Sequence, residues 1–398
     1  HLQAELLHPD NEREIVLTRH GRFGLRMERA SVTLPLGAAE SAPQYRLDFR
    51  VPGQLRNLIW LPQPEPVLAP GQIEVRVVAT GLNFRDIMYL MGLLPDEAVE
   101  SGFAGASLGL EFSGVVTRVG QTGDEFAVGD AVMGFGPACF ASHVVTQATA
   151  LSHKPADWSF ESAATVPTVF FTVYYAFKNL ANLQPGERVL IHGAAGGVGI
   201  AAVQLALHLG AEIFATVGSE EKLDFVTLLG ADHVLDSRSL AFADDILALT
   251  DGQGVDVVLN SLAGEAIRRN LRVLKPFGRF LELGKRDFFE NTPIGLRPFK
   301  DNISYFGIDA DQLLLARPAL AGQLFREVMA LFADGSLFPL PYRVFDAHHA
   351  IDAFRVMQQA QQIGKVVVKF DGAMVPVEPA PVVGFKRGGG KDSTWLIT

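Results

Sequence analysis

A glycine-rich turn carries the strongest chemical signal in the sequence. Four glycines between residues 193 and 199 follow the apolar run 189–191 and open the apolar-faced segment 198–209. This order predicts a strand, a tight turn and a helix, with free backbone N–H groups and the positive end of the helix dipole facing one point. A pyrophosphate suits that point, whereas a tight turn without a ligand is the alternative. The residues predicted to contact a dinucleotide here are Gly196, Gly197, Val198 and Gly199.

The end of the next predicted strand discriminates between two dinucleotides. An NAD enzyme usually places Asp or Glu about 20 residues past the turn, where the carboxylate accepts from the ribose 2′-OH. Here the strand 213–217 ends in glycine and Ser219, and Lys222 follows one helical turn later. A hydroxyl and a cation suit a 2′-phosphate, which predicts NADPH rather than NADH. Lys222 as a solvated helix residue is the alternative, and Glu220 and Glu221 count against a phosphate.

Two more polar turns follow predicted strands. An Asn-Ser pair at 260–261 follows the strand 255–259, and a Gly-Lys pair at 284–285 follows the strand 278–283. Ligands collect at the carboxyl ends of strands in open α/β sheets, which makes both pairs site candidates. Both pairs are also common in ordinary turns, so turn chemistry is the alternative.

The elements that must position these turns alternate between strand and helix after residue 162. The predicted strands are 189–192, 213–217, 233–235, 255–259 and 278–283, and the predicted helices are 170–179, 198–209, 222–229, 240–249 and 264–274. Such alternation predicts a parallel, doubly wound sheet with crossover helices. The preceding region, 45–167, has short β runs interrupted by helical spacing at 83–91, and the following region has helices at 319–333 and 347–360 and a strand at 365–370. We therefore predict an α/β protein in which a β-rich domain is interrupted by a nucleotide-binding domain.

Composition excludes several classes of function. The chain of 398 residues is 48% hydrophobic and 20% charged, with a formal net charge of −10. It offers no basic surface for nucleic acid or anionic membrane, and no apolar run approaches a membrane span. One cysteine, Cys139, excludes an internal disulfide and a cysteine-built zinc cluster, which indicates a reducing cytoplasm.

Five linked motifs resemble the enoyl reductase domain of polyketide and fatty acid synthases, a zinc-independent member of the medium-chain dehydrogenase/reductase superfamily. They are the segments 81–86, 166–175, 190–199, 260–262 and 282–285, within a likeness that spans about 45–372. The resemblance implies a GroES-like substrate domain that encloses an inserted Rossmann domain. The implied boundaries are 44–167 and 309–372 for the GroES-like domain and 168–308 for the Rossmann domain.

The two ends of the chain resemble connecting segments of such synthases. Residues 1–43 resemble the entering linker, with expected strands at 14–18 and 24–28 around a turn at 20–22. Residues 373–398 resemble a linker and the truncated start of a ketoreductase, at 395–398. We therefore expect one domain of a larger polypeptide, with a dehydratase and a ketoreductase as neighbours.

The implied reaction is the NADPH-dependent reduction of a trans-2-enoyl thioester on an acyl carrier protein. Hydride goes to Cβ and a proton to Cα, and the implied proton donors are Lys285 and Asp311, 26 residues apart. A salt bridge between these two residues that merely joins the domains is the alternative, and Asp309 could stand in for Asp311. Leu94 occupies a position where polyketide relatives often carry a tyrosine, so we expect no tyrosine donor.

The resemblance also transfers cofactor contacts by position. They are Asn83, Thr172, Gly196, Gly197, Val198, Gly199, Ser219, Lys222, Arg238, Asn260, Ser261, Leu283, Gly284 and Lys365. Arg238 would add a second cation at the 2′-phosphate, with an ordinary surface-loop residue as its alternative. Zinc-dependent relatives carry Gly-His-Glu where this chain has Gly109-Leu110-Glu111, and they carry a four-cysteine lobe that this sequence lacks. No metal is therefore implied.

Other functions stay open on the sequence. A free-standing quinone or enoyl-CoA reductase would share the fold, and an inactive scaffold domain would keep the glycine turn without turnover. Fatty acid synthase relatives pair through their nucleotide-binding domains while some modular ones are monomeric. An apolar edge near 299–308 favours a homodimer.

Overall fold

The computed structural model describes residues 15–18, 21–24, 44–100, 102–121, 125–370 and 375–378. The chain divides into two compact units, residues 1–41 and 42–398. In the first unit, β1 (Ile15–Thr18) pairs antiparallel with β2 (Gly21–Gly24). The turn expected at 20–22 is wrong, because the pairing of Thr18 with Gly21 brings the second strand forward into it. Residues 25–28 of the expected strand, and the 395–398 segment, lie outside the described residues.

A parallel sheet of six strands forms the core of the region 188–307 among the described residues. Its spatial order is β12-β11-β10-β13-β14-β15. The strands are β10 (Arg188–His192), β11 (Glu212–Val217), β12 (His233–Asp236), β13 (Val255–Asn260), β14 (Leu274–Glu282) and β15 (Ser304–Gly307). The central strands β10, β11 and β13 are rich in buried apolar residues, as expected for strands covered on both faces, whereas the edge strands β12 and β15 are more exposed.

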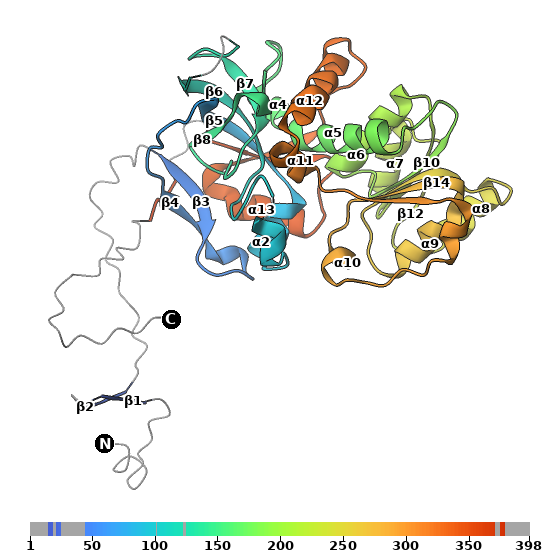
Figure 1. The fold of residues 1–398 in the computed structure, drawn as a ribbon, viewed down its shortest axis with the longest axis horizontal. Coiled ribbons are helices and arrows are strands. Elements are labelled where there is room, and N and C mark those ends of the chain that lie inside the picture. Colours follow the sequence, from blue (N-terminus) through green and yellow to red (C-terminus); the bar gives the residue numbers. More distant parts are fainter. Residues whose placement is uncertain are drawn as a thin grey trace, which may run out of the picture. The chain divides into compact units, whose positions relative to one another are not determined.

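Helices cover both faces of this sheet (Figure 1). The helices that follow or precede its strands are α5 (Pro167–Tyr174), α6 (Gly197–His208), α7 (Glu220–Leu229), α8 (Phe242–Leu249) and α9 (Glu265–Val273). Val189 and Ile191 pack with α5 and α6 on one face. Leu190 packs with Phe242 and Ile267, from α8 and α9, on the other. The alternation of β10 side chains therefore divides the core into two layers.

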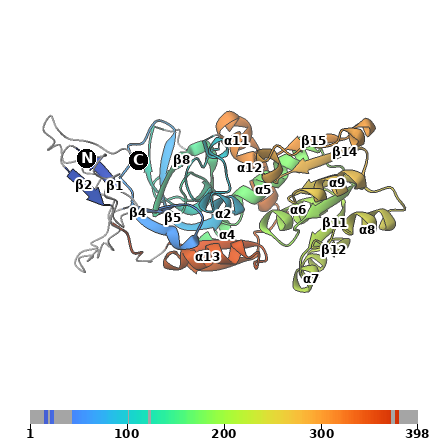
Figure 2. The ribbon, with the colours of Figure 1, turned by 90° about the horizontal axis from the view of Figure 1, so that it is seen from below.

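A second sheet contains β5 (Gln72–Leu82) as a central strand, and most of its strands precede the parallel sheet in sequence. Its order is β16-β17-β5-β6-β7-β9, with β8 also on β5. The other strands are β6 (Glu111–Val119), β7 (Ala131–Phe135), β8 (His143–Gln147), β9 (Leu151–His153), β16 (Tyr342–Asp346) and β17 (Lys365–Lys369). The hairpin of β3 (Tyr45–Phe49) and β4 (Leu58–Pro62) adds Trp60 to the core of this region. The helix α13 (Ala350–Gln358) contacts β16 and β17 and lies beside α2 (Phe84–Leu90) (Figure 2).

The predicted fold class is confirmed, with local differences in the elements. The expected helix 170–179 is α5 followed by a π-helical segment, Tyr175–Leu180, and the expected helix 347–360 is a 3-10 turn, Ala347–His349, followed by α13. The strands β15 and β16 and the helix α11 (Ala310–Ala316) were not predicted, and α12 (Pro318–Ala333) matches its prediction. The remaining short helices are α3 (Asp96–Glu100), α4 (Phe160–Ala163) and α10 (Arg286–Phe289). None of the helices in the described ranges is both long and apolar enough to cross a bilayer.

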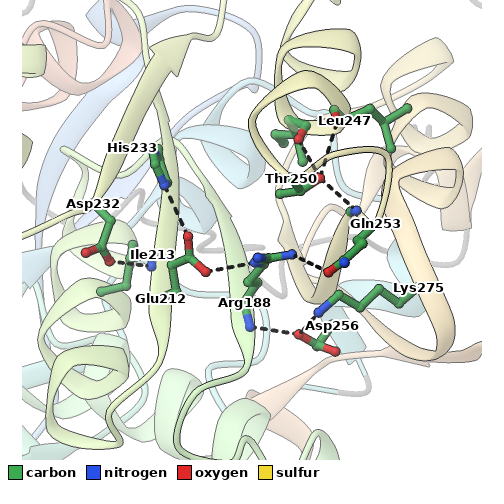
Figure 3. A network of polar contacts seen from close by, with 12 residues as sticks. Arg188, Glu212, Ile213, Asp232, His233, Leu247, Thr250, Gln253, Asp256 and Lys275 are labelled. Carbon is green, nitrogen blue, oxygen red and sulfur yellow. Dashed lines mark hydrogen bonds and ion pairs between the residues drawn. The ribbon is translucent and has the colours of Figure 1, made fainter.

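The amino ends of the parallel strands carry charged side chains that bond to one another. At the amino ends of the strands, charged side chains cross-link neighbouring strands (Figure 3). Arg188 donates through Nε to Glu212, 2.8 Å away, and its backbone N–H donates to Asp256, which also accepts from Lys275 Nζ at 2.8 Å. These contacts pair the charged side chains at the amino ends with one another.

The closing strand β17 returns the chain to the glycine turn. Gly364 donates its backbone N–H to Ala195 O at 2.9 Å, and Gly364 and Gly196 form an isolated parallel bridge. Gly364 has a φ of +73°, and a Cβ there would lie 2.0 Å from Pro341 O. Only glycine fits this approach, which sets Lys365 beside the turn.

Substitution of Gly364 tests this junction. Gly364→Ala is expected to lower the free energy of unfolding by about 3 kcal/mol, because it combines a left-handed backbone with a backbone clash. Gly335→Ala is the matched control, since Gly335 has a φ of +79° with open space around it, and it should cost only about 1 kcal/mol. Urea unfolding of both variants measures the difference, and equal losses would contradict the proposed clash.

Candidate functional site

A cleft of about 660 Å³ lies at the carboxyl ends of the parallel strands and takes its lining from both sheets. The glycine turn, the two polar turns, α2 and β17 all contribute to it. Predicted site residues in its lining are Asn83, Thr172, Gly196, Gly197, Val198, Gly199, Ser261, Leu283, Gly284, Lys285, Asp311 and Lys365. Of the described residues predicted for the site, Ser219, Lys222, Arg238 and Asn260 lie outside the lining.

The glycine turn has the geometry of an anion cradle. Gly193 has a φ of +63°, and a Cβ on Gly199 would lie 2.4 Å from Gly193 O. Gly196 caps the twelve-residue helix α6, whose first N–H groups are free to face a phosphate. Within the described residues, two buried polar atoms of cleft-lining side chains, Thr168 Oγ1 and Gln362 Oε1, have no partner. Unpartnered buried polar atoms beside a bare helix end fit a polar dinucleotide.

A separate cationic corner lies where β11 and β12 end. Ser219 caps α7 by accepting from the backbone N–H of Lys222 at 3.4 Å. Lys222 Nζ donates to Ala360 O at 2.7 Å. Burial lowers the pKa of Lys222, the nearby charge of Arg238 lowers it further, and Glu221 opposes both. Two cations close enough to disfavour each other suit an anion that neutralises both.

Lys285 is held by a different acid from the one predicted. Its Nζ donates to Ile308 O at 2.8 Å and pairs with Asp309 Oδ2 at 3.1 Å. The alternative in which Lys285 salt-bridges Asp311 is therefore wrong. Asp309 stands immediately before α11, whereas Asp311 is in its first turn, so the two carboxyl groups diverge.

Asp311 is partly buried and contacts the loop that contains Ala104. Its Oδ1 accepts from the backbone N–H of Ala104 at 3.3 Å. Burial raises the pKa of Asp311 to about 6; the nearby Asp309 also raises it, while Arg85, the Ala104 hydrogen bond and Lys285 lower it. The cleft thus contains a lysine with a fixed counter-ion and a carboxyl group that exchanges its proton near neutral pH.

A buried ion pair connects β6, β17 and α2 at the wall of the cleft. Lys365 Nζ contacts Glu111 Oε1, and the two side chains are 3% and 0% exposed. Lys365 also donates to Asn83 Oδ1 at 2.8 Å and to Leu82 O at 3.0 Å. Glu111 accepts from Asn83 Nδ2 and from the backbone N–H of Thr168, both at 2.8 Å. Asn83 and Lys365, predicted separately, are therefore parts of one network.

Asn260 is more buried than expected for a residue predicted to contact a cofactor. Asn260 is fully buried, and its amide binds Leu262, Asn270 and Glu282 rather than facing the cleft. Sequence reasoning missed the roles of Glu111 and Glu282, although a charged residue inside an apolar strand is a detectable signal. The tyrosine-equivalent position, Leu94, does line the cleft.

Comparison with known proteins places this geometry in a family. Residues 69–156 match the family model of the alcohol dehydrogenase GroES-like domain, and residues 197–318 match that of the zinc-binding dehydrogenase. The solved CurK enoyl reductase is 40% identical with a TM-score of 0.76, and the match covers 82% of this chain and 99% of that one. The JamJ enoyl reductase is 37% identical with the same TM-score and the same two coverages.

A curated relative shows the larger setting. A phenolphthiocerol/phthiocerol polyketide synthase protein of Mycobacterium tuberculosis is 41% identical over 363 residues, which is 89% of this chain and 16% of that protein. The chain thus spans about one sixth of the length of this relative.

Two potential zinc ligands outside the cleft lining, Glu111 and Cys139, do not fit the zinc ion in one family name. Both Glu111 oxygens are occupied by Lys365, Asn83 and Thr168. Cys139, the one cysteine of the sequence, is buried and donates to Gly136 O, and burial raises its pKa well above the usual range. A thiol in this state is a poor zinc ligand.

Removing one partner of the buried ion pair should cost more than removing both. Lys365→Met leaves the Glu111 carboxylate uncompensated and is expected to lower the free energy of unfolding by about 3–5 kcal/mol. The Glu111→Gln/Lys365→Met double variant should recover more than half of that loss. The exposed pair Arg355–Asp352 is the control, with an expected change below about 1 kcal/mol for Asp352→Asn. Chemical unfolding measures all three, and additive losses in the double variant would refute the coupling.

Proposed function

Since the chain belongs to the enoyl reductase family of polyketide synthases, within the medium-chain dehydrogenase/reductase superfamily, we propose that it reduces a trans-2-enoyl thioester with NADPH. The observation that carries this proposal is the cleft that joins the glycine turn to Lys285 and Asp311. The thioester would be carried by an acyl carrier protein, with dehydratase and ketoreductase domains in the same polypeptide.

The cleft and the cationic corner beside it would together hold NADPH. The N–H groups at the start of α6 would bind its pyrophosphate, and Ser219, Lys222 and Arg238, outside the cleft lining, would bind its 2′-phosphate. Lys222 would exchange its bond to Ala360 O for this phosphate. NADPH, when bound, supplies the hydride that enters at Cβ of the substrate. Asn260 supports the floor of the site from below, since its amide is fully engaged inside the protein.

Lys285 and Asp311 divide the remaining chemistry between them. The ammonium of Lys285, held in place by Asp309 and Ile308 O, stabilises negative charge that develops on the thioester oxygen. Asp311 holds the proton that Cα receives, because burial keeps a fraction of its carboxyl groups neutral near pH 7. Leu94 is apolar, so no hydroxyl competes at that position.

The proposal extends to the oligomeric state, the compartment and the partners of the protein. The strand β15 (Ser304–Gly307) is an edge of the parallel sheet and supports pairing of two copies into a homodimer. A reducing cytoplasm suits a chain with one buried cysteine, Cys139, and no nucleic acid or membrane partner is proposed for a chain with a net charge of −10.

Cofactor preference is the first test. The purified chain should oxidise NADPH, followed at 340 nm, in the presence of a crotonyl thioester of pantetheine or acyl carrier protein, and NADH should react at least about tenfold more slowly. The Lys222→Ala/Arg238→Ala variant should lose at least about tenfold in kcat/KM for NADPH and keep its value for NADH. Equal losses for both cofactors would refute the assignment of the 2′-phosphate corner. Tight NADPH binding without turnover of either thioester would support the inactive-scaffold alternative.

The pH profile tests Asp311. A proton donor must be protonated, so kcat/KM should fall as the pH rises through about 6 and above, approaching tenfold per unit. Asp311→Asn should reduce kcat/KM about 100-fold and flatten this limb. Asp309→Asn is the control: it loosens Lys285 and removes a charge that raises the pKa of Asp311, so the limb should move to lower pH without flattening. An unchanged limb in Asp311→Asn would assign the proton to another group.

A further inference from the structure

A line of buried polar side chains runs along the floor of the cleft, and one of them, His192, contributes to the cleft lining. Thr216, His192, Asn270, Asn260 and Glu282 come from β11, β10, α9, β13 and β14, and each is at most 5% exposed. Successive contacts along this line measure 2.9, 2.8, 2.9 and 2.7 Å. The line therefore connects neighbouring strands of the sheet at their carboxyl ends, directly under the site.

Every hydrogen bond in this line points the same way. The backbone N–H of Leu262 donates to Asn260 Oδ1 at 3.2 Å, which identifies that atom as the acceptor and Nδ2 as the donor to Glu282. Asn260 Oδ1 also accepts from Asn270 Nδ2, so Asn270 Oδ1 must accept from His192 Nε2–H. His192 Nδ1 then accepts from the Thr216 hydroxyl. The donors all point toward the Glu282 carboxyl group.

His192 is fixed in one state by this arrangement. Burial lowers the pKa of His192 to about 4, so the ring is neutral and has a single N–H. That N–H is committed to Asn270, and a ring with the opposite tautomer would place a bare nitrogen against an oxygen. Neutral, fully satisfied polar groups in a sheet core specify one arrangement of the elements that carry them.

The Glu282 end of the line contacts the turn formed by Leu283, Gly284 and Lys285. Glu282 Oε1 accepts the backbone N–H of Gly284 at 2.6 Å, and Asn260 O accepts that of Leu283 at 2.9 Å. Leu283, Gly284 and Lys285 line the cleft, as does Ser261 next to Asn260. The near end lies under the glycine turn, because Thr216 O accepts the backbone N–H of Ala194 at 3.0 Å.

We propose that Glu282 is a positioning residue for the reduction: together with Asn260, and at the end of the line from Thr216, it holds the Leu283–Lys285 turn against the cofactor. The proposal rests on the proposed function, because it assumes that this turn contacts NADPH. It assigns to Glu282 a role in cofactor affinity, through the two acceptor oxygens that hold Asn260 Nδ2 and Gly284 N–H at once.

Other groups around Glu282 cannot replace it. Tyr305 on β15 approaches with its hydroxyl 3.5 Å from Oε2, and Asp287 on α10 contributes only like charge. Lys285 Nζ is directed to Asp309 and Ile308 O instead. Burial, with a smaller contribution from Asp287, outweighs the hydrogen bonds from Asn260, Gly284 and Tyr305 and raises the pKa of Glu282 to about 7.

Exchanging the polarity of one hydrogen bond tests the proposal. Glu282→Gln turns one acceptor into a donor that faces Asn260 Nδ2 or Gly284 N–H. Asn260→Asp places two carboxylates face to face. Each single variant should weaken NADPH binding, measured by fluorescence without acyl substrate, about tenfold. In the Asn260→Asp/Glu282→Gln double variant the amide of residue 282 donates to the carboxylate of residue 260, so affinity should be at least about threefold higher than in the Asn260→Asp variant. Recovery should stay incomplete, because Leu262 O loses the donor that Asn260 Nδ2 supplies.

A matched control separates positioning from general stability. Glu74 is also buried, 3% exposed, and accepts from Arg118 on the second sheet, away from the cleft. Glu74→Gln should lower the melting temperature and leave the NADPH affinity within about twofold. A double variant that binds NADPH as weakly as the product of the single effects, or a Glu282→Gln variant that binds like the parent chain, would overturn the proposal. Failure of the parent chain to bind NADPH would instead refute the proposed function.

The unaltered protein offers a second measurement that needs no variant. Nitrogen-15 spectra of histidine-labelled protein should show His192 neutral between about pH 5 and pH 8, with its proton on Nε2. A proton on Nδ1, or a titration in this range, would contradict the direction of the line and with it the proposed support of Glu282.

Discussion

The buried ion pair between Lys365 and Glu111 is the contact on which the cleft depends. Two charges removed from water are tolerated only when each is fully hydrogen-bonded, and Asn83, Leu82 O and the Thr168 N–H complete the shells. The pair fixes β17 and β6 against each other and brings the Lys365 stem to the glycine turn. A Cβ on Gly197 would lie 2.9 Å from Lys365 Cδ. A side chain at position 197 would therefore displace the Lys365 side chain.

The polar side chains at the two ends of the parallel strands differ in charge and in pairing. Ion pairs such as Arg188–Glu212 and Lys275–Asp256 cross-link the amino ends, where no ligand has to approach. At the carboxyl ends, three of the buried polar side chains, His192, Asn260 and Asn270, are neutral. The charged groups there include Lys285, Asp311 and the pair Lys222 and Arg238. The proposed dinucleotide would therefore meet helix N–H groups and cations, above polar groups that are already hydrogen-bonded to one another.

The sequence predicted the features that depend on local pattern. Apolar runs and crossover helices identified the parallel sheet, and the glycine spacing identified its turn, because both signals are contained in a few consecutive residues. Contacts between side chains distant in sequence were harder to predict, because they depend on how the elements pack. The choice of Asp309 over Asp311 for Lys285 depends on where α11 begins, and the depth of Asn260 depends on Asn270 and Glu282. The π-helical segment at 175–180 interrupts a helix whose periodicity looked continuous, and the short strands β15 and β16 are defined by pairing with β14 and β17 rather than by composition.

Hydride and proton are proposed to enter adjacent carbons of an enoyl thioester in this cleft, and isotopic labelling tests this most directly. The experiment supplies NADPH deuterated at the transferable position, with a crotonyl thioester, and locates the label in the product by NMR. We predict deuterium at Cβ from the cofactor and, in a parallel reaction in deuterated water, deuterium at Cα from solvent through Asp311. Deuterium at the thioester carbonyl carbon, or cofactor oxidation without label in the acyl chain, would contradict the proposed reaction.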